Sequence, residues 1–205
     1  MVDDFLKARH AGAIGLDIGC GNGKYLPVNK NVFIVASDRY MTRNTFSVLV
    51  VLTSLCSSSQ LAKIARQHQP HSVLVADTIA LPHPDSSFDF AISIAVIHHL
   101  STTERRVDAI RAILQKLRPA GQALFFVWAL EQRDSRRGWD DGHEQDVLVP
   151  WVLKPQSNAC DPPVTYERYY HLYRKGELQK DICTAGGKVI ESGYDRDNWW
   201  CIAQH

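Results

Sequence analysis

Five short runs of apolar residues are spaced along the first two thirds of the chain. Each run holds five or six residues and is apolar almost throughout. Such runs are typical of strands that are covered on both faces of a sheet. The sequence therefore predicts five buried strands, at residues 13–17, 32–37, 72–76, 90–95 and 123–128.

Between the fourth and fifth runs, apolar residues recur at the spacing of a helix. Ser101 and Glu104 match the capping-box pattern, so a helix is expected to begin there. One buried face of this helix is predicted to hold Val107, Ile110, Leu114 and Leu117, and residues 118–121 to end it. A shorter helix is predicted at residues 61–67. Strands that alternate with helices predict an α/β fold with a mainly parallel sheet and right-handed crossovers.

The amino-acid composition of the chain changes after Trp128. Residues 131–163 are rich in charge, Gly and Pro, and we expect them to form a long loop on the substrate side. Order returns with a predicted helix at residues 176–185, which Gly186 ends. Two final strands at residues 188–194 and 198–203 are expected to form a hairpin. This hairpin would place one antiparallel strand in the sheet.

Length and composition narrow the classes of protein to consider. With 205 residues the chain is expected to form one domain, residues 1–205. A net charge of +1 argues against a generally polyanion-binding surface, although it is compatible with a local basic patch. The five cysteines include no C-x-x-C pair, which argues against a disulfide framework or a zinc ribbon and favours a reducing compartment. No secretory leader or membrane-spanning run is recognisable, so we expect no membrane association.

The strongest local signal is the motif DIGCGNG at residues 17–23, directly after the first predicted strand. Alternate glycines let the backbone turn sharply and approach a ligand closely. The dinucleotide-binding fingerprint has one residue more before its last glycine. The acidic Asp17 ahead of the turn suits a cationic ligand better than a pyrophosphate, and S-adenosylmethionine is such a ligand.

Two further acidic residues follow the second and third predicted strands. Asp38 is placed to accept hydrogen bonds from ribose hydroxyls, and Asp77 from an adenine amino group. Carboxylates at the same edge of a parallel sheet agree with ligand binding at the carboxyl ends of the strands. The alternative is that these are turn-forming residues of a generic α/β domain. The predicted cofactor-binding residues are Asp17, Gly19, Gly21, Gly23, Asp38, Asp77, Thr78 and Ala95.

Several later segments carry a more specific pattern. They are SIAVIHH at 93–99, VWALEQ at 127–132, QDVLVPW at 145–151, YYHLYRKGEL at 169–178 and SGYDRDNWW at 192–200. Together with the glycine turn they resemble, over most of residues 15–203, the tRNA wobble-uridine carboxymethyl methyltransferases. These are class I S-adenosylmethionine-dependent methyltransferases with a Rossmann-like fold of seven strands and helices on both faces.

This resemblance implies a reaction and two partners. The family esterifies 5-carboxymethyluridine in the tRNA anticodon loop, and its enzymes work as heterodimers with a small zinc-binding activator subunit. In the usual strand order of this fold the strand at residues 72–76 lies at the sheet edge. We expect the activator to add a strand there. We expect the protein in the cytoplasm, with the nucleus as a second location.

The implied nucleophile is a carboxylate, which is already ionised at neutral pH and needs no strong base. The candidate catalytic residues are His98 and His99, of which one is expected to face the substrate while the other packs. An alternative is that both are structural. No further ligand of recognisable spacing suggests a metal site. Candidate substrate-binding residues are Arg133, Tyr170, Arg174 and Arg196.

Two other functions share these motifs. A small-molecule carboxylate methyltransferase would keep every cofactor residue and differ only after Trp128. An inactive methyltransferase-fold scaffold is the second alternative. It is suggested by the short segment before the first strand and by residues 40–59, which look inserted. A nicotinamide oxidoreductase is disfavoured by the spacing of the glycines.

Overall fold

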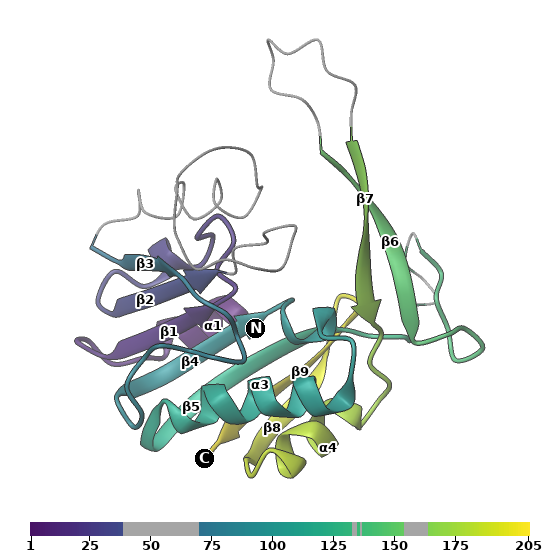
Figure 1. Ribbon diagram of the computed structural model, residues 1–205. Coiled ribbons are helices and arrows are strands. Elements are labelled where there is room, and N and C mark those ends of the chain that lie inside the picture. Colours follow the sequence, from purple (N-terminus) through teal and green to yellow (C-terminus); the bar gives the residue numbers. More distant parts are fainter. Residues whose placement is uncertain (39–69, 133–134, 136, 154–163) are drawn as a thin grey trace, which may run out of the picture.

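The computed structural model describes residues 1–38, 70–132, 135, 137–153 and 164–205 of the chain. Its main sheet consists of β1 (Ile14–Ile18), β2 (Phe33–Asp38), β3 (Ser72–Val75), β4 (Phe88–Ile94), β5 (Leu117–Trp128), β8 (Lys188–Asp195) and β9 (Asn198–Gln204). The strands lie side by side in the order β3-β2-β1-β4-β5-β9-β8 (Figure 1). The first five run parallel, while β9 is antiparallel to both of its neighbours.

Helices cover both faces of this sheet. One face packs against α3 (Thr103–Gln115) and α4 (Glu177–Thr184), whose buried side chains join those of β1, β4 and β5. The other face packs against α1 (Val2–Lys7) and the short 3-10 helix η1 (Leu26–Val28). The fold is therefore the Rossmann-like α/β arrangement that the alternating pattern predicts. The five early strands, the helix after Gly176 and the closing hairpin are confirmed, with ends shifted by a few residues.

The predicted bounds of the long helix were wrong by a turn at most. Its N-cap is Thr102, not Ser101, because Thr102 has extended backbone angles and its hydroxyl accepts a hydrogen bond from the Arg105 amide (3.3 Å). Ser101 therefore does not cap the helix, contrary to the prediction from the capping-box pattern. The helix ends at Gln115, and Leu117 already belongs to β5. Residues 118–121 lie inside this strand, next to an irregularity in its pairing with β4.

The predicted long loop at residues 131–163 contains a strand that the sequence pattern did not predict. It is β6 (Asp146–Leu153), which pairs antiparallel with β7 (Val164–His171) over eight residue pairs. This β6–β7 hairpin projects from the carboxyl end of the main sheet (Figure 1). Charge, Gly and Pro dominate the average composition of the segment, and they masked the apolar run of β6.

Some predictions fall outside the described residues. These are the helix at 61–67, the inserted segment at 40–59 and the substrate-binding Arg133. Within the described parts of the chain, no helix has both the length and the apolar composition needed to cross a bilayer.

Candidate active site

The glycine turn connects β1 to the ligand side of the sheet. Gly19 and Gly21 have φ angles of +74° and +53°, which residues with a Cβ rarely adopt. The amide of Gly19 donates to the Ser37 carbonyl (2.8 Å), and the amide of Gly21 donates to a carboxylate oxygen of Asp38 (2.7 Å). The end of β2 thus holds the turn that follows β1, and the predicted residues Asp38 and Gly21 meet.

Asp17 lies beneath this turn and is only 1% exposed. Burial, and after it the charge of Asp38, raise the pKa of the Asp17 carboxyl to about 7. Its Oδ2 atom is buried and accepts no hydrogen bond from any described residue. An unpartnered buried carboxylate oxygen is costly, so its presence beside the turn indicates a site for a hydrogen-bond donor or cation.

The other predicted cofactor residues surround the same edge of the sheet. Asp77 follows β3, and one of its carboxylate oxygens accepts from the Ile79 amide (3.1 Å), as in a local turn. Thr78 is buried, whereas Ala95 is exposed at the end of β4 with a φ of +60°. A non-glycine residue in this conformation is uncommon and is often found at functional sites.

The space above the turn fits a ligand that brings both a cation and hydroxyl groups. A Cβ added to Gly21 would meet no atom within 4 Å, so this glycine faces open space. A Cβ on Gly19 would instead lie 2.2 Å from Val96 and collide with it. Gly19 is therefore required by packing, while Gly21 is required by its backbone angle and by the space it leaves. Together with Asp17 and Asp38, these features fit S-adenosylmethionine.

The two histidines lie in the 3-10 helix η2 (Ile97–His99), which follows β4. His98 is fully buried, and its Nδ1 accepts from the Trp128 amide (3.0 Å). His99 is exposed, and its Nδ1 donates to the Tyr169 carbonyl (3.0 Å). A ring nitrogen that accepts from an amide carries no proton, so neutral His98 bears its proton on Nε2. A ring nitrogen that donates to a carbonyl oxygen must carry a proton, so neutral His99 bears its proton on Nδ1.

Both histidines have a depressed pKa. Burial, then the charges of His99 and His171, hold the pKa of His98 well below its ordinary value. Although part of His99 reaches solvent, desolvation by the side chains around its ring also lowers its pKa; its hydrogen bond to Tyr169 opposes this effect and the charge of Arg168 adds to it. Both side chains are therefore neutral at pH 7. The buried Nε2 of His98 has no partner among the described residues.

An aromatic cluster encloses the histidines. The ring of Tyr170 stacks on Trp128 with a centroid distance of 4.2 Å and an interplanar angle of 10°. Tyr170 also contacts His99 at 4.4 Å and His98 at 5.1 Å. The end of β5 and the base of the β6–β7 hairpin thus form one wall beside η2.

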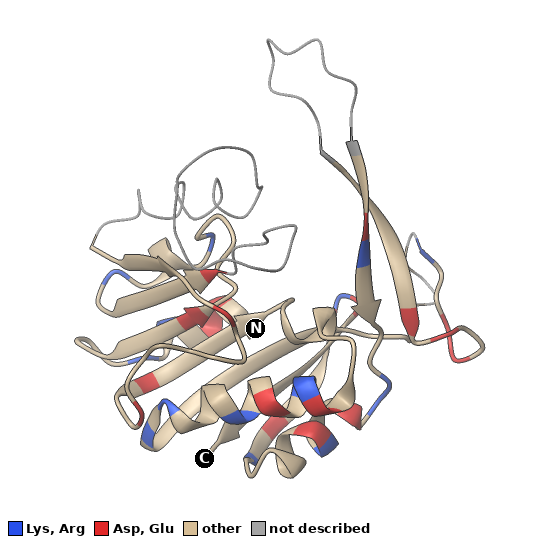
Figure 2. Cartoon of the chain, viewed as in Figure 1, with Lys and Arg blue, Asp and Glu red and all other residues tan. Residues whose placement is uncertain are grey.

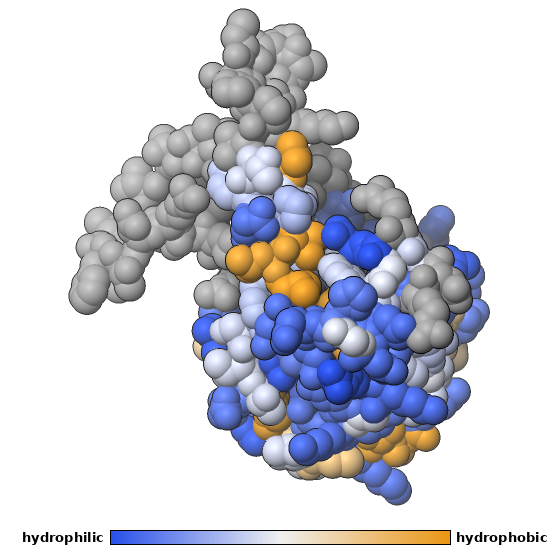
Figure 3. Space-filling model, turned by 90° about the vertical axis from the view of Figure 1, so that its right-hand side faces the viewer, coloured by the Kyte–Doolittle hydropathy of each residue, from blue (hydrophilic) through white to orange (hydrophobic). Residues whose placement is uncertain are grey.

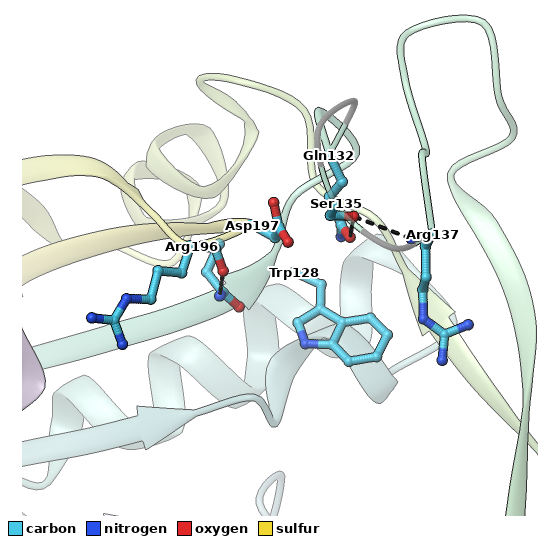
Figure 4. A pocket seen from close by; sticks show the side chains of 7 residues that line it. Trp128, Gln132, Ser135, Arg137, Arg196 and Asp197 are labelled. Carbon is cyan, nitrogen blue, oxygen red and sulfur yellow. Dashed lines mark hydrogen bonds between the residues drawn. The ribbon is translucent and has the colours of Figure 1, made fainter.

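A cavity of about 310 Å³ is lined in part by Trp128. Its lining comes from the end of β5, from the segment after it and from the turn between β8 and β9 (Figure 4). The lining residues are Trp128, Gln132, Ser135, Arg137, Arg196, Asp197 and Asn198. The Arg137 guanidinium lies 5.7 Å from the Trp128 ring centre. The cavity therefore combines an aromatic face with two arginines, which suits a planar ligand attached to an anionic chain.

Comparison with known proteins places this site in a family. Residues 16–125 match the family model described as a methyltransferase domain. The whole chain aligns with the tRNA (carboxymethyluridine(34)-5-O)-methyltransferase of Schizosaccharomyces pombe at 47% identity, covering 86% of that protein. It also aligns with the enzyme of the same name from Saccharomyces cerevisiae, at 41% identity over 87% of that protein.

The chain belongs to the tRNA (carboxymethyluridine(34)-5-O)-methyltransferase family. As a methyltransferase it also shares its fold with solved structures of low sequence identity. A methyltransferase from Methanosarcina mazei has a TM-score of 0.66 at 16% identity, with 96% of this chain and 93% of that one covered. The amino pentose methyltransferase of Micromonospora echinaspora has a TM-score of 0.64 at 16% identity, covering 98% and 87%.

The methyltransferase brings most of the predicted site residues together. Asp17, Asp38 and the glycines meet at one edge of the sheet, while Tyr170 stacks on Trp128 and Arg196 lines the cavity next to it. Arg174 is exposed ahead of α4 and does not line the cavity. Trp128, Gln132 and Arg137 line the cavity but were not among the predicted site residues. The signal for Trp128 was its position at the carboxyl end of a parallel strand.

Proposed function

We propose that this methyltransferase transfers a methyl group from S-adenosylmethionine to the carboxylate of 5-carboxymethyluridine at the wobble position of tRNA, which gives the methyl ester. The observation that carries this proposal is the match over the whole chain to the two yeast proteins named for this modification. The cavity beside Trp128 supports it, because it offers a planar ligand an aromatic face and two cations.

S-adenosylmethionine, when bound, supplies a methyl group on a positively charged sulfur. The chain itself binds and positions. Asp17 accepts a hydrogen bond from the ammonium group of the cofactor, which satisfies its unpartnered Oδ2. Asp38 accepts from the ribose hydroxyls while it holds the Gly21 amide. Asp77 and Thr78 would hold the adenine of the bound cofactor, and Ala95 would face its methyl group.

The substrate carboxylate is the nucleophile, with an ordinary pKa of about 4. It needs orientation and partial desolvation more than deprotonation. Neutral His98 and His99 suit this task, since a cationic histidine would hold the anion tightly and weaken it as a nucleophile. In our proposal His99 contacts the nucleoside through its Nε2, which the bond to Tyr169 leaves as an acceptor. His98 packs below and positions Trp128.

The substrate base lies against the aromatic cluster in this proposal. Tyr170 and Trp128 form its apolar wall, and Arg196, whose side chain is 95% exposed, holds a phosphate at the mouth of the cavity. Arg174 and Arg133 contact the tRNA further out. Arg174 is exposed, while Arg133 lies outside the described residues.

The same proposal includes a small zinc-binding activator subunit bound at β3. Support comes from the position of β3 as the first strand of the sheet, with β2 as its strand partner among the described residues. Val75 of β3 is 50% exposed and Phe33 of β2 is 37% exposed, so apolar surface is present at this edge. We place the complex in the cytoplasm and the nucleus, which suits the free cysteines Cys20, Cys183 and Cys201.

The test is methyl transfer to tRNA from a strain that lacks the enzyme. The chain, co-expressed with its activator, should incorporate label from S-adenosylmethionine into this tRNA but little into tRNA from the parent strain. Mild alkali should release the label as methanol, because the product is an ester. Label that resists alkali would show a different acceptor atom and contradict the proposed reaction. Labelling of small carboxylates but not of tRNA would favour a metabolite methyltransferase.

A further inference from the structure

The β6–β7 hairpin has two unlike faces, because side chains alternate across a strand. The aromatic face carries Val147, Val149 and Trp151, opposite Tyr170, Arg168 and Tyr166 respectively. The outer face carries Asp146, Leu148, Pro150 and Val152, opposite His171, Tyr169, Glu167 and Thr165. In Figure 3, hydrophobic side chains gather on the side of the molecule from which the hairpin projects. Leu148 and Val152 of the outer face are 64% and 50% exposed.

The aromatic face continues the wall of the active site. At its base Tyr170 stacks on Trp128 and contacts His99. One pair further along, Arg168 lies close enough to His99 for its charge to depress the pKa of that histidine. The Arg168 guanidinium lies 4.0 Å from the ring centre of Trp151, and the Trp151 ring lies 6.1 Å from that of Tyr166. A row of rings and one guanidinium therefore leads outward from the histidines.

Charge distinguishes the two faces. Arg168 is the only charged residue on the aromatic face of the described ladder, whereas the outer face carries Asp146 and Glu167. Figure 2 shows the hairpin as mostly uncharged, with one basic segment on β7. An anionic polymer is therefore attracted to the aromatic face and repelled by the outer one. Trp151, Tyr166 and Arg168 are half-buried, so part of each side chain is accessible.

We propose that the aromatic face binds the single-stranded nucleotides next to the methylated uridine, with Trp151 stacking on a base and Arg168 contacting a phosphate. Proteins hold single-stranded RNA by such stacking on aromatic rings and by cations along the backbone. At about 3.3 Å per residue, the eight paired residues extend roughly 25 Å, enough for several nucleotides. This inference rests on the proposed function and names the residues that extend its substrate site.

The test compares the two faces of the same strand. Trp151→Ala is measured beside Leu148→Ala and Val152→Ala, with an anticodon stem-loop that bears 5-carboxymethyluridine. Loss of one stacked base corresponds to a weakening of about five- to 150-fold. We expect Trp151→Ala to raise Kd and KM for the stem-loop within this range. Its cofactor affinity should stay within about twofold of wild type, as should all values for the outer-face variants.

Arg168 is tested through salt. A contact with one phosphate of a single strand contributes about 0.7 to the slope of log Kd against log salt concentration. Arg168→Ala should reduce this slope by about that amount, while Arg168→Lys should keep the slope. Trp151→Leu keeps apolar volume without a π face. It should lose affinity as Trp151→Ala does, and it serves in place of that variant should the alanine chain not fold.

Three results would overturn the inference. In the first, Trp151→Leu and Leu148→Ala bind the stem-loop equally well. In the second, Arg168→Ala leaves the salt slope unchanged. In the third, the variants lose the activator subunit rather than the stem-loop, which would make the aromatic face a protein interface. A wild-type chain that methylates no tRNA at all would refute the proposed function itself, and the inference with it, so the two failures are distinguishable.

Discussion

The buried carboxyl group of Asp17 lowers the free energy of unfolding when it is ionised. Its carboxyl group is buried beside the glycine turn, and its pKa is raised from 3.8 to about 7. A carboxyl group with a raised pKa binds its proton more tightly in the folded chain than in the unfolded one. The free energy of unfolding therefore falls as the pH rises from about 4 to about 7. The loss at pH 8 is at most about 4 kcal/mol.

Asp17→Asn should separate stability from function. Without the cofactor, the variant should melt at a higher temperature than wild type at pH 8, and by a smaller margin at pH 5, where wild-type Asp17 is protonated. Its affinity for S-adenosylmethionine should fall at least about tenfold, because an ionic hydrogen bond is lost. Calorimetry and thermal melts at both pH values measure this. The same difference in melting temperature at pH 5 and pH 8 would contradict the assigned pKa.

Asp38 has two tasks, since it holds the Gly21 amide and is proposed to accept from ribose. Asp38→Ala should weaken cofactor binding at least about tenfold, since charge-assisted hydrogen bonds contribute about 1.5–3 kcal/mol each. Asp38→Asn keeps a carbonyl acceptor for Gly21 and should lose less. Calorimetry on the folded variants is the measurement. Unchanged affinity of Asp38→Ala would refute the assignment of the cofactor site.

At the scale of elements, a buried polar network joins α3, α4 and the β6–β7 hairpin. Arg106 of α3 is 3% exposed. Its Nε atom lies 3.7 Å from Oδ2 of Asp181, and its Nη2 atom lies 3.8 Å from Oε1 of Glu177, both in α4. His171 at the end of β7 contacts Glu177 (2.7 Å) and Asp146 (2.8 Å). Burial opposes ionisation of Glu177, yet hydrogen bonds from His171 and from the Arg174 amide hold its pKa below the ordinary value. The network fixes the base of the hairpin, and with it Tyr170.

Arg106→Ala should therefore destabilise the fold strongly. Removing one member of a buried ion pair leaves its partners uncompensated, which costs about 3–5 kcal/mol. Arg111→Ala is the matched control on the same helix, because its pair with Asp108 is exposed and such pairs contribute about 0–1 kcal/mol. Denaturant unfolding measures both. Equal, small losses for the two variants would show that Arg106 is not structurally important.

At the scale of the whole molecule, methyl transfer and cofactor binding should depend on pH in different ways. With saturating cofactor, kcat should stay nearly flat from mildly acidic to neutral pH, because the substrate carboxylate is already ionised and both histidines are neutral. The ratio kcat/KM for the cofactor should fall below pH 7, since Asp17 must first lose its proton. Steady-state kinetics across this range provide the check. A kcat that rises steeply above neutral pH would indicate a hydroxyl or amine acceptor instead.

The two edges of the sheet offer a matched test of the partner. We expect poor solubility of the isolated chain and a one-to-one complex with the activator. Leu74→Lys in β3 should weaken this complex and leave cofactor affinity unchanged, because a buried lysine is costly at an interface. Ile190→Lys in β8, at the opposite edge and 45% exposed, should have no effect. Co-purification measures both. A monomeric chain that is soluble and fully active would refute the heterodimer.

Local sequence patterns predict many of the secondary-structure elements of this molecule. The apolar runs of β1 to β5 and the glycines of residues 17–23 are read directly from the sequence, because each reflects a requirement of nearby backbone. The ends of α3 were less accurate. Ser101 and Thr102 are both good caps, and only the extended angles of Thr102 decide between them.

The sequence by itself determined the fold class and predicted which carboxylates lie at one edge of the sheet, because hydrophobic period and the order of strands place the ends of parallel strands together. Tertiary structure decided the rest. His98 is the buried histidine, and it contacts Trp128, which lies 30 residues away in the chain. The stacking of Tyr170 on Trp128 depends on the β6–β7 hairpin, which lies in a segment of polar average composition. These contacts join residues far apart in the chain. No local periodicity records such contacts, because packing between elements creates them.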